Sequence, residues 1–216
     1  DVLSKFIQDE KRPPYTFKRR CIEHSLYGVD IDPGAVEIAK LRLWLSLVVD
    51  EDDIKNIKPL PNLDYKIVCG NSLIGYPHPP RGLEHIEKLK ERFFEEVNPK
   101  NKNKLRSQIN DAIYGLFQIT EKSLGYKVTM DFKINFSEVF HEKGGFDIVI
   151  GNPPYVQLQK DKGKLANMYK NCRYKTFERT GDIYVLFYEN GINILKKRGH
   201  LCFITSNKWM RARYGE

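Results

Sequence analysis

Short apolar runs that alternate with longer helical segments constrain the fold of this chain more than any other feature. The runs, each closed by turn-forming or polar residues, lie at 26–30, 65–69, 146–150 and 201–205. Between them, the segments 33–49 and 182–197 have apolar residues at helical spacing. Alternating strands and helices imply crossover connections, which make neighbouring strands parallel and cover both faces of the sheet. We therefore expect an α/β fold with a doubly wound, mostly parallel sheet.

The first strand is expected to lead straight into a long helix. Asp32 suits the N-cap because its carboxylate can accept the free amide hydrogens of the first turn, and Pro33 suits the first helical position. The helix should end at about Val49. Its apolar residues form two adjoining stripes, which predict a broad buried face. The stripes are Val36, Ala39, Leu43 and Leu47 beside Ile38, Leu41, Leu45 and Val48.

A charged segment interrupts this alternation. From about Leu83 to Ile119, a helical pattern broken near Pro99 predicts two helices, which form an insertion at about 78–124. The basic residues at the start of the second helix either touch phosphates or form an ordinary solvated face: Lys100, Lys102 and Lys104. Strict alternation of apolar and polar residues from Tyr126 to Phe136 then predicts an edge strand or hairpin arm with one buried face.

The last part of the chain is predicted to hold one more helix and one more strand. Asp182 suits the N-cap of the helix over 182–197, and Gly199, just after Arg198, suits its end. The strand at 201–205 follows. This order continues the alternation of helices and strands.

Composition favours a polyanionic partner and gives no sign of a metal site. The 36 basic and 28 acidic residues give a net charge of +8, which favours phosphate contacts. The four cysteines are scattered, as in a reduced cytoplasmic protein, and Cys21 with His24 lacks further ligands at metal-binding spacing. No apolar run reaches the roughly 18 residues of a membrane span. Because the chain opens at Asp1 without methionine and stops at Glu216 without a boundary signal, we expect 1–216 to be a partial domain.

Polar residues follow each predicted strand. In open α/β sheets, ligands bind at the carboxyl ends of the strands, so these residues are candidates for a functional site. They are Asp30, Asn71, Asn152 and the group Thr205, Ser206 and Asn207. Simple turn formation explains Asn71 and Asn207 about equally well.

Asn152 stands in the stiffest of these loops. Pro153 and Pro154 restrict their own φ angles and the residue before each, while Gly151 lets another group approach the backbone closely. An aromatic amine is a poor nucleophile because its lone pair is delocalised into the ring. Hydrogen bonds to an amide oxygen and a backbone carbonyl would favour a pyramidal nitrogen, whose lone pair is aimed at an electrophile. Tyr155 offers a stacking face for a base removed from its duplex, although a rigid turn with a core tyrosine is the alternative.

With these motifs in sequence order, the chain resembles the amino-group DNA adenine methyltransferases. The matching segments are Leu26 to Leu47, Cys69 to Leu73, Gly145 to Val156 and Gly181 to Trp209. More narrowly, the chain is similar to the gamma-arranged, TaqI-like core of type IIG restriction-modification enzymes, which has a helical insertion before the catalytic loop. The likeness is loose at 1–22 and 157–175. It implies a Rossmann-like methyltransferase sheet that uses S-adenosyl-L-methionine and methylates a flipped adenine at N6 in double-stranded DNA.

The resemblance also implies which residues contact the cofactor. Asp30 would bind the ribose hydroxyls, and Ile31 would pack against the cofactor adenine. Asn71 stands where the family commonly has an acid that contacts the adenine amine, and Ser72 follows it in the same motif. An amide in place of the acid makes that contact weaker.

The target base has its own residues by the same resemblance. Asn152 and the carbonyl of Pro153 would hold the target amine, and Tyr155 would stack on the target ring. Tyr214 would pack against the flipped base from another side. Asp182 belongs to a segment typical of the family, and helix capping remains its simpler role.

The family's first motif, a strand followed by a glycine-rich turn that cradles the methionine part of the cofactor, is missing. We expect it upstream of Asp1, so the isolated fragment should be inactive and bind the cofactor poorly. No nuclease signature is present, because Asp131 and Lys133 lack an accompanying Pro-Asp pair. The resemblance implies a linked target-recognition domain and leaves a linked nuclease open. The rival interpretations are a methyltransferase of protein glutamine or RNA guanine, and an inactive nucleic-acid-binding fragment.

Overall fold

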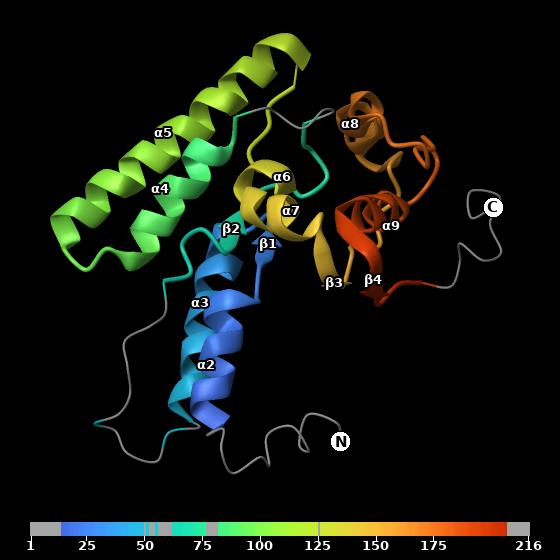
Figure 1. The fold of residues 1–216 in the computed structure, drawn as a ribbon. Coiled ribbons are helices and arrows are strands. Elements are labelled where there is room, and N and C mark those ends of the chain that lie inside the picture. The colour runs from blue at the N-terminus through green and yellow to red at the C-terminus, as the bar shows by residue number, and fades with distance from the viewer. Residues whose placement is uncertain are drawn as a thin grey trace. The chain divides into compact units, whose positions relative to one another are not determined.

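The computed structural model describes residues 14–49, 51, 55, 62–76, 82–124 and 126–206. The chain is a mixed α/β protein that divides after Asn71 into two compact units (Figure 1). Each unit holds one pair of parallel strands. We describe each unit by itself.

The first unit is built on one short parallel ladder. Strand β1 pairs with β2, with Gly28 opposite Ile67 and Asp30 opposite Cys69. The elements of this unit are α2 (Pro14–His24), β1 (Gly28–Asp30), α3 (Pro33–Val48) and β2 (Ile67–Cys69). Both strands and the helix predicted here are confirmed, although each strand is two residues shorter at its start than the apolar run.

Helix α3 begins as predicted and buries only one of its two apolar stripes. The Asp32 carboxylate accepts hydrogen bonds from the amides of Gly34 (2.7 Å) and Ala35 (3.4 Å), and Pro33 opens the helix. The buried stripe contributes to a core made of Tyr15, Ile22, Val36, Leu47, Leu63 and Ile67. The other stripe stays exposed at Ile38, Leu41 and Leu45. The prediction of a broad buried face was therefore wrong for this part of the protein, because the described unit has no element that covers the second stripe.

The second unit begins with the predicted insertion. Helices α4 (Glu84–Glu95) and α5 (Pro99–Leu124) lie side by side as a hairpin, which confirms two helices with a break just before Pro99 (Figure 1). Phe93 is fully buried between them, with the charged ends of Lys102 and Arg106 at 5.2 Å and 5.6 Å from its ring centre. At these distances the two positive charges can form cation–π contacts with the ring.

The prediction of a strand from Tyr126 to Phe136 was wrong. Residues 132–135 form the short helix α6 (Phe132–Asn135), and α7 (Ser137–Lys143) follows. Asp131 caps α6, because its carboxylate accepts hydrogen bonds from the amides of Lys133 (2.8 Å) and Ile134 (3.1 Å). The Asn135 side chain returns a bond by accepting from the Asp131 amide at 2.9 Å. This reciprocal capping favours a helical turn over an extended chain.

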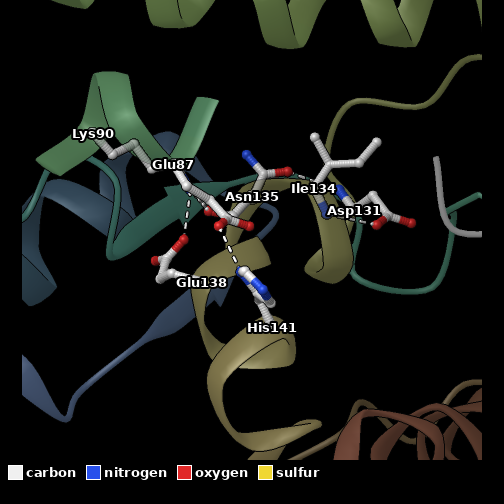
Figure 2. Close-up of polar contacts among 7 residues, drawn as sticks. All are labelled: Glu87, Lys90, Asp131, Ile134, Asn135, Glu138 and His141. Carbon is white, nitrogen blue, oxygen red and sulfur yellow. Dashed lines mark hydrogen bonds and ion pairs between the residues drawn. The ribbon is translucent and has the colours of Figure 1, made fainter. Parts of the chain in front are cut away.

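Polar contacts of two α4 side chains hold α4 against α6 and α7 (Figure 2). Lys90 is buried, and its ammonium group donates hydrogen bonds to the carbonyl of Asn135 and, at 3.0 Å, to the Glu138 carboxylate. One turn earlier on α4, Glu87 lies 3.1 Å from the Nδ1 atom of His141. Burial lowers the pKa of Lys90, and the Glu138 charge opposes that shift. Together these contacts connect the α4–α5 hairpin to α7, the helix that leads into the next strand.

The last strands form the second parallel pair. Strand β3 (Phe146–Gly151) pairs with β4 (Leu195–Phe203), which follows α9 (Ile183–Ile194). Between the two strands, the chain also forms α8 (Lys160–Tyr169) and the short 3-10 helix η2 (Lys170–Cys172). The apolar run at 146–150 is thereby confirmed as a strand, and the strand predicted at 201–205 is confirmed as the end of a longer one.

Helix α9 ends earlier than the pattern predicted. It stops at Ile194 instead of Lys197, so Gly199 does not end it. Leu195 pairs with Phe146 and already belongs to β4. The register of the pairing then shifts. Ile148 pairs with His200, so an advance of two residues along β3 corresponds to an advance of five residues along β4. Leu195 fits the helical spacing in sequence, but its pairing with β3 extends the backbone instead.

Candidate functional site

The loop after β3 begins where two strand ends meet. Gly151 pairs with Phe203, and its carbonyl accepts a hydrogen bond from the Ile204 amide at 3.1 Å. A Cβ atom on Gly151 would lie 3.0 Å from the Phe203 ring, so a side chain here would crowd the neighbouring strand. Glycine at this position therefore lets β3 run close to β4 up to the start of the loop.

Asn152 and the two prolines occupy the first positions of the loop. The Asn152 side chain is exposed, and no hydrogen bond joins it to any other described residue. Pro153 is buried and Pro154 is exposed. The loop is stiff because both prolines fix φ. The Asn152 side-chain oxygen is available to an outside donor because Asn152 is exposed.

Tyr155 is held by its hydroxyl while its ring stays accessible. The hydroxyl donates a hydrogen bond to the Ile204 carbonyl at 3.0 Å. The ring meets Tyr184 edge-on, with ring centres 6.2 Å apart and planes at 84°. Tyr155 is 51% exposed. It is therefore no core residue, and a planar group could stack on it without displacing packed side chains.

Asp182 fixes the far end of the loop. Its carboxylate accepts hydrogen bonds from the amides of Val156 (3.0 Å) and Tyr184 (3.4 Å), so it caps α9, as predicted, and also holds the loop. The Ile183 amide donates to the Val156 carbonyl at 2.9 Å. The sequence indicated the cap but not the bond to Val156, which joins residues 26 positions apart.

The remaining polar strand end is partly described. The hydroxyls of Thr205 and Tyr188 are hydrogen-bonded at 2.8 Å, so Thr205 contacts α9. Asn207 and Tyr214 lie outside the described residues. The predicted contact of Tyr214 with a flipped base accordingly stays a prediction.

The predicted cofactor residues fall mostly in the first unit. Asp30 is exposed at the end of β1, and its carboxylate accepts a hydrogen bond from the Asp32 amide at 2.8 Å. Ile31 is 70% exposed. Asn71 is half-buried at the end of this unit. Ser72 begins the second unit, where its carbonyl accepts a hydrogen bond from the Asn190 side chain at 3.0 Å.

A pocket of about 450 Å³ lies between β1 and α3 in the first unit. Asp30 lines it together with apolar residues of β1, α3 and β2, among them Val29, Val36 and Ile67. Its lining combines the Asp30 carboxylate with the side chains of Arg42 and Ser46 and a largely apolar wall. This composition is typical of sites that bind small organic molecules with a few polar groups.

Metal-binding and membrane-spanning features are both missing from the described part of the chain. No group of three or more histidine, cysteine, aspartate or glutamate side chains there is arranged to hold a metal ion. Among the same residues, no helix has the length and apolar character needed to cross a membrane.

Comparison with known families assigns the chain. The model of the Eco57I restriction-modification methylase family matches residues 24–216, which include both strand pairs and the loop at Asn152. The chain belongs to the Eco57I restriction-modification methylase family. This membership confirms the resemblance to the methyltransferase core of type IIG restriction-modification enzymes. No solved structure matches this family member.

Three relatives of this Eco57I-family chain cover different parts of it. A putative type II restriction enzyme and methyltransferase of Methanocaldococcus jannaschii is 27% identical, over 92% of this chain and 23% of the relative. The type II restriction enzyme and methyltransferase RM.Eco57I of Escherichia coli is 26% identical, over 94% of this chain and 16% of the relative. A type II methyltransferase of Pseudomonas aeruginosa is 41% identical, over 34% of this chain and 12% of the relative. The chain therefore spans less than a quarter of the length of the curated relatives that it matches.

Proposed function

We propose that this chain carries the methyl-transfer site of a DNA adenine-N6 methyltransferase that uses S-adenosyl-L-methionine. The observation that carries the proposal is an exposed Asn152, in a stiff loop at the end of a parallel strand, in a member of the Eco57I restriction-modification methylase family. The accessible Tyr155 ring beside it supports a planar substrate. The proposal covers the substrate and the cofactor as well as the residues.

The cofactor-binding residues have chemistry that fits S-adenosyl-L-methionine. Asp30 has exposed carboxylate oxygens that can accept hydrogen bonds from two ribose hydroxyls. Ile31 offers an exposed apolar side chain to the adenine ring. Asn71 and Ser72, at the end of the next strand, are the proposed contacts to the rest of the nucleoside. When bound, S-adenosyl-L-methionine supplies an electrophilic methyl group.

The loop residues would prepare the amine for attack. The Asn152 amide oxygen and the Pro153 carbonyl accept hydrogen bonds from the two amine hydrogens, which favours a pyramidal nitrogen. These bonds strengthen as the nitrogen becomes cationic, so they stabilise the transition state more than the ground state. Tyr155 stacks on the flipped base and holds it in line with the methyl group. The new nitrogen–carbon bond would form as the methyl–sulfur bond breaks, S-adenosylhomocysteine would leave, and the cationic nitrogen would then lose one proton to solvent. No covalent bond between enzyme and substrate is needed.

At the level of the domain, we propose that the chain belongs to a Rossmann-like, doubly wound methyltransferase sheet. Each pair is parallel, as this fold requires, and β3 carries exposed apolar side chains at Ile148 and Ile150 that a complete domain would cover. The insertion at about 78–124 would be an addition to that sheet. A strand with the glycine-rich turn that is missing from this sequence would complete the cofactor site.

For the full-length protein, we propose double-stranded DNA as the substrate and a linked target-recognition domain. Relatives named as both restriction enzyme and methyltransferase make a linked nuclease a reasonable further part. The net charge of +8 favours DNA over most protein substrates. The rival substrates are a protein glutamine and an RNA guanine, whose amino groups pose the same chemical problem.

Incubation of the full-length protein with radiolabelled S-adenosyl-L-methionine and duplex DNA, RNA or total protein tests the substrate. We expect label in DNA alone. Label in protein or RNA alone would contradict DNA as the substrate. Undetectable cofactor binding by the full-length protein would instead favour the inactive, nucleic-acid-binding alternative.

A further inference from the structure

A strongly basic segment follows the catalytic loop directly. Residues 157–181, here called the basic loop, hold seven basic and two acidic residues, a net charge of +5 out of +8 for the chain. All seven basic residues are exposed: Lys160, Lys162, Lys164, Lys170, Arg173, Lys175 and Arg179. More than half of the net positive charge therefore lies in a short segment that begins two residues after Tyr155.

The two ends of the basic loop are fastened together beside Tyr155. Gln157 and Asp182 form an antiparallel bridge, and the Leu158 amide donates a hydrogen bond to the Gly181 carbonyl at 2.9 Å. The same Asp182 side chain holds the Val156 amide. The basic loop therefore begins and ends next to residues 152–156, the proposed catalytic loop.

Internal contacts keep the basic loop in one shape. Leu158, Ala166 and Tyr169 are buried within the second unit. The Tyr174 hydroxyl donates to the Leu73 carbonyl at 2.7 Å. The Glu189 carboxylate of α9 accepts from the amides of Lys175 (3.0 Å) and Thr176 (2.8 Å). A preformed backbone lowers the entropy cost when the exposed charges bind a partner.

Most of the positive charges are not neutralised within the described structure. Lys164 pairs with Asp161 at 2.9 Å. The other lysines and Arg173 form no ion pair with a described residue: Lys160, Lys162, Lys170, Lys175 and Arg173. Lys162 and Arg173 also have left-handed φ angles of 56° and 58°, which disfavour side chains other than glycine. Such strain is retained mainly where function requires it.

We infer that the basic loop binds the phosphate backbone of duplex DNA next to the target base. The inference rests on the proposed function, which supplies DNA as the substrate. A phosphate backbone is a better partner for the basic loop than a protein surface would be. Met168 is the one large apolar side chain that is exposed among the described residues of the loop. A protein interface would need a larger apolar centre. Lysine and arginine contacts to phosphate position the duplex without reading its sequence.

A triple variant of the full-length protein tests this inference. Lys162→Asn, Lys170→Gln and Arg173→Asn remove three of the charges, and asparagine tolerates the left-handed backbone at the first and last positions. The matched control, Lys88→Gln, Arg92→Gln and Lys133→Gln, removes three exposed charges from α4 and α6. Both proteins are titrated with a mixed-sequence DNA duplex over a range of salt concentrations, and cofactor binding reports whether each is folded.

We expect the loop variant to bind the duplex at least about tenfold more weakly at low salt. Its plot of log affinity against log salt should be less steep by about 1 to 3, since each lost phosphate contact lowers the slope by about 0.9. The control should bind within about twofold of the wild type. Unchanged affinity and slope in the loop variant, or a loss confined to the control, would overturn the inference.

Failure of the inference and failure of the proposed function give different results. A wild-type protein that methylates DNA while the loop variant binds it normally would overturn the basic loop alone. Label in RNA or protein instead of DNA would overturn the proposed function, whatever the titration shows. Tighter binding of polyglutamate than of duplex DNA would overturn phosphate as the partner.

Discussion

Asp182 and Gly145 show how single residues without a chemical role position the proposed catalytic loop. Asp182 holds the loop and the first turn of α9 with one carboxylate. Gly145 precedes β3 with a φ of 145°, and a Cβ atom there would lie 2.7 Å from the Ile194 carbonyl oxygen. A side chain at Gly145 would thus push the start of β3 away from the end of α9. Both residues act on the direction in which Asn152 is presented.

Protonation of His141 is expected to make the stability of the folded protein depend on pH. The hydrogen bond that the His141 ring donates to Glu87, and then the negative charge of Glu87, raise the pKa of His141 above its ordinary value of 6.5. The protonated form is therefore favoured in the folded protein. The contact between protonated His141 and Glu87 therefore stabilises the folded protein fully below pH 6.5, and this stabilisation is lost as pH rises through the folded-state pKa of His141.

Glu87→Gln should lower the pKa of His141 toward 6.5, because it removes the charge and weakens the hydrogen bond. Nuclear magnetic resonance titration of the imidazole measures this directly. Glu84→Gln is a control, because Glu84 makes a smaller contribution to the same shift. An equal pKa in the wild type and in Glu87→Gln would show that the contact between Glu87 and His141 is not formed.

Among the helices, the α4–α5 hairpin is anchored by a charged side chain and not by apolar packing alone. Lys90 reaches from α4 to the carbonyl that ends α6 and to Glu138 in the first turn of α7 (Figure 2). Helix α7 then leads through Gly144 and Gly145 into β3. A shift of α4 can therefore reach β3, the strand that leads to Asn152.

Lys90→Met should weaken this anchor. Methionine is close in length to lysine, so the main effect is the loss of two hydrogen bonds and of the charge opposite Glu138. We expect the free energy of local opening of α4 to fall by about 1 to 3 kcal/mol. Hydrogen-deuterium exchange of α4 peptides measures it. Lys88→Met, at an exposed position of the same helix, should change it by less than about 0.5 kcal/mol. Equal protection in both variants would contradict the anchor.

Elements specified by local patterns were predictable from the sequence. The cap at Asp32, the helix after it and the apolar strand β3 all depend on neighbours within a few residues. Helix α6 was missed because its alternating residues fit a strand, while Asp131 and Asn135 stabilise a helical turn by capping each other. The early end of α9 was missed because it depends on pairing with Phe146, far away in sequence.

The candidate site was likewise predictable only where it depends on local sequence. The motif identified Asn152 and Tyr155, but nothing local indicated that the Tyr155 hydroxyl would bond to Ile204, 49 residues away. That bond fixes the ring while leaving about half of the residue exposed. The exposure of Asn152 likewise follows from the path of the whole loop. Sequence therefore identifies candidate chemical groups, and tertiary contacts decide whether a substrate can reach them.

For the whole molecule, one strand pair in each compact unit carries one half of the proposed chemistry. Asp30 and Ile31, the proposed cofactor contacts, lie in the first unit, and Asn152 and Tyr155, the proposed contacts of the base, lie in the second. Membership of the Eco57I restriction-modification methylase family accounts for both sets in one chain. The central claim is that Asn152 directs a methyl group to the amino nitrogen of adenine.

Mass spectrometry of nucleosides from DNA treated with the full-length protein and S-adenosyl-L-methionine tests this claim most directly. The wild type should yield N6-methyladenine. Asn152→Ala should yield at least about a hundredfold less while binding the cofactor normally, because it loses a hydrogen bond that strengthens in the transition state. A wild-type level of N6-methyladenine from Asn152→Ala, or a methylated base other than adenine from the wild type, would contradict the account.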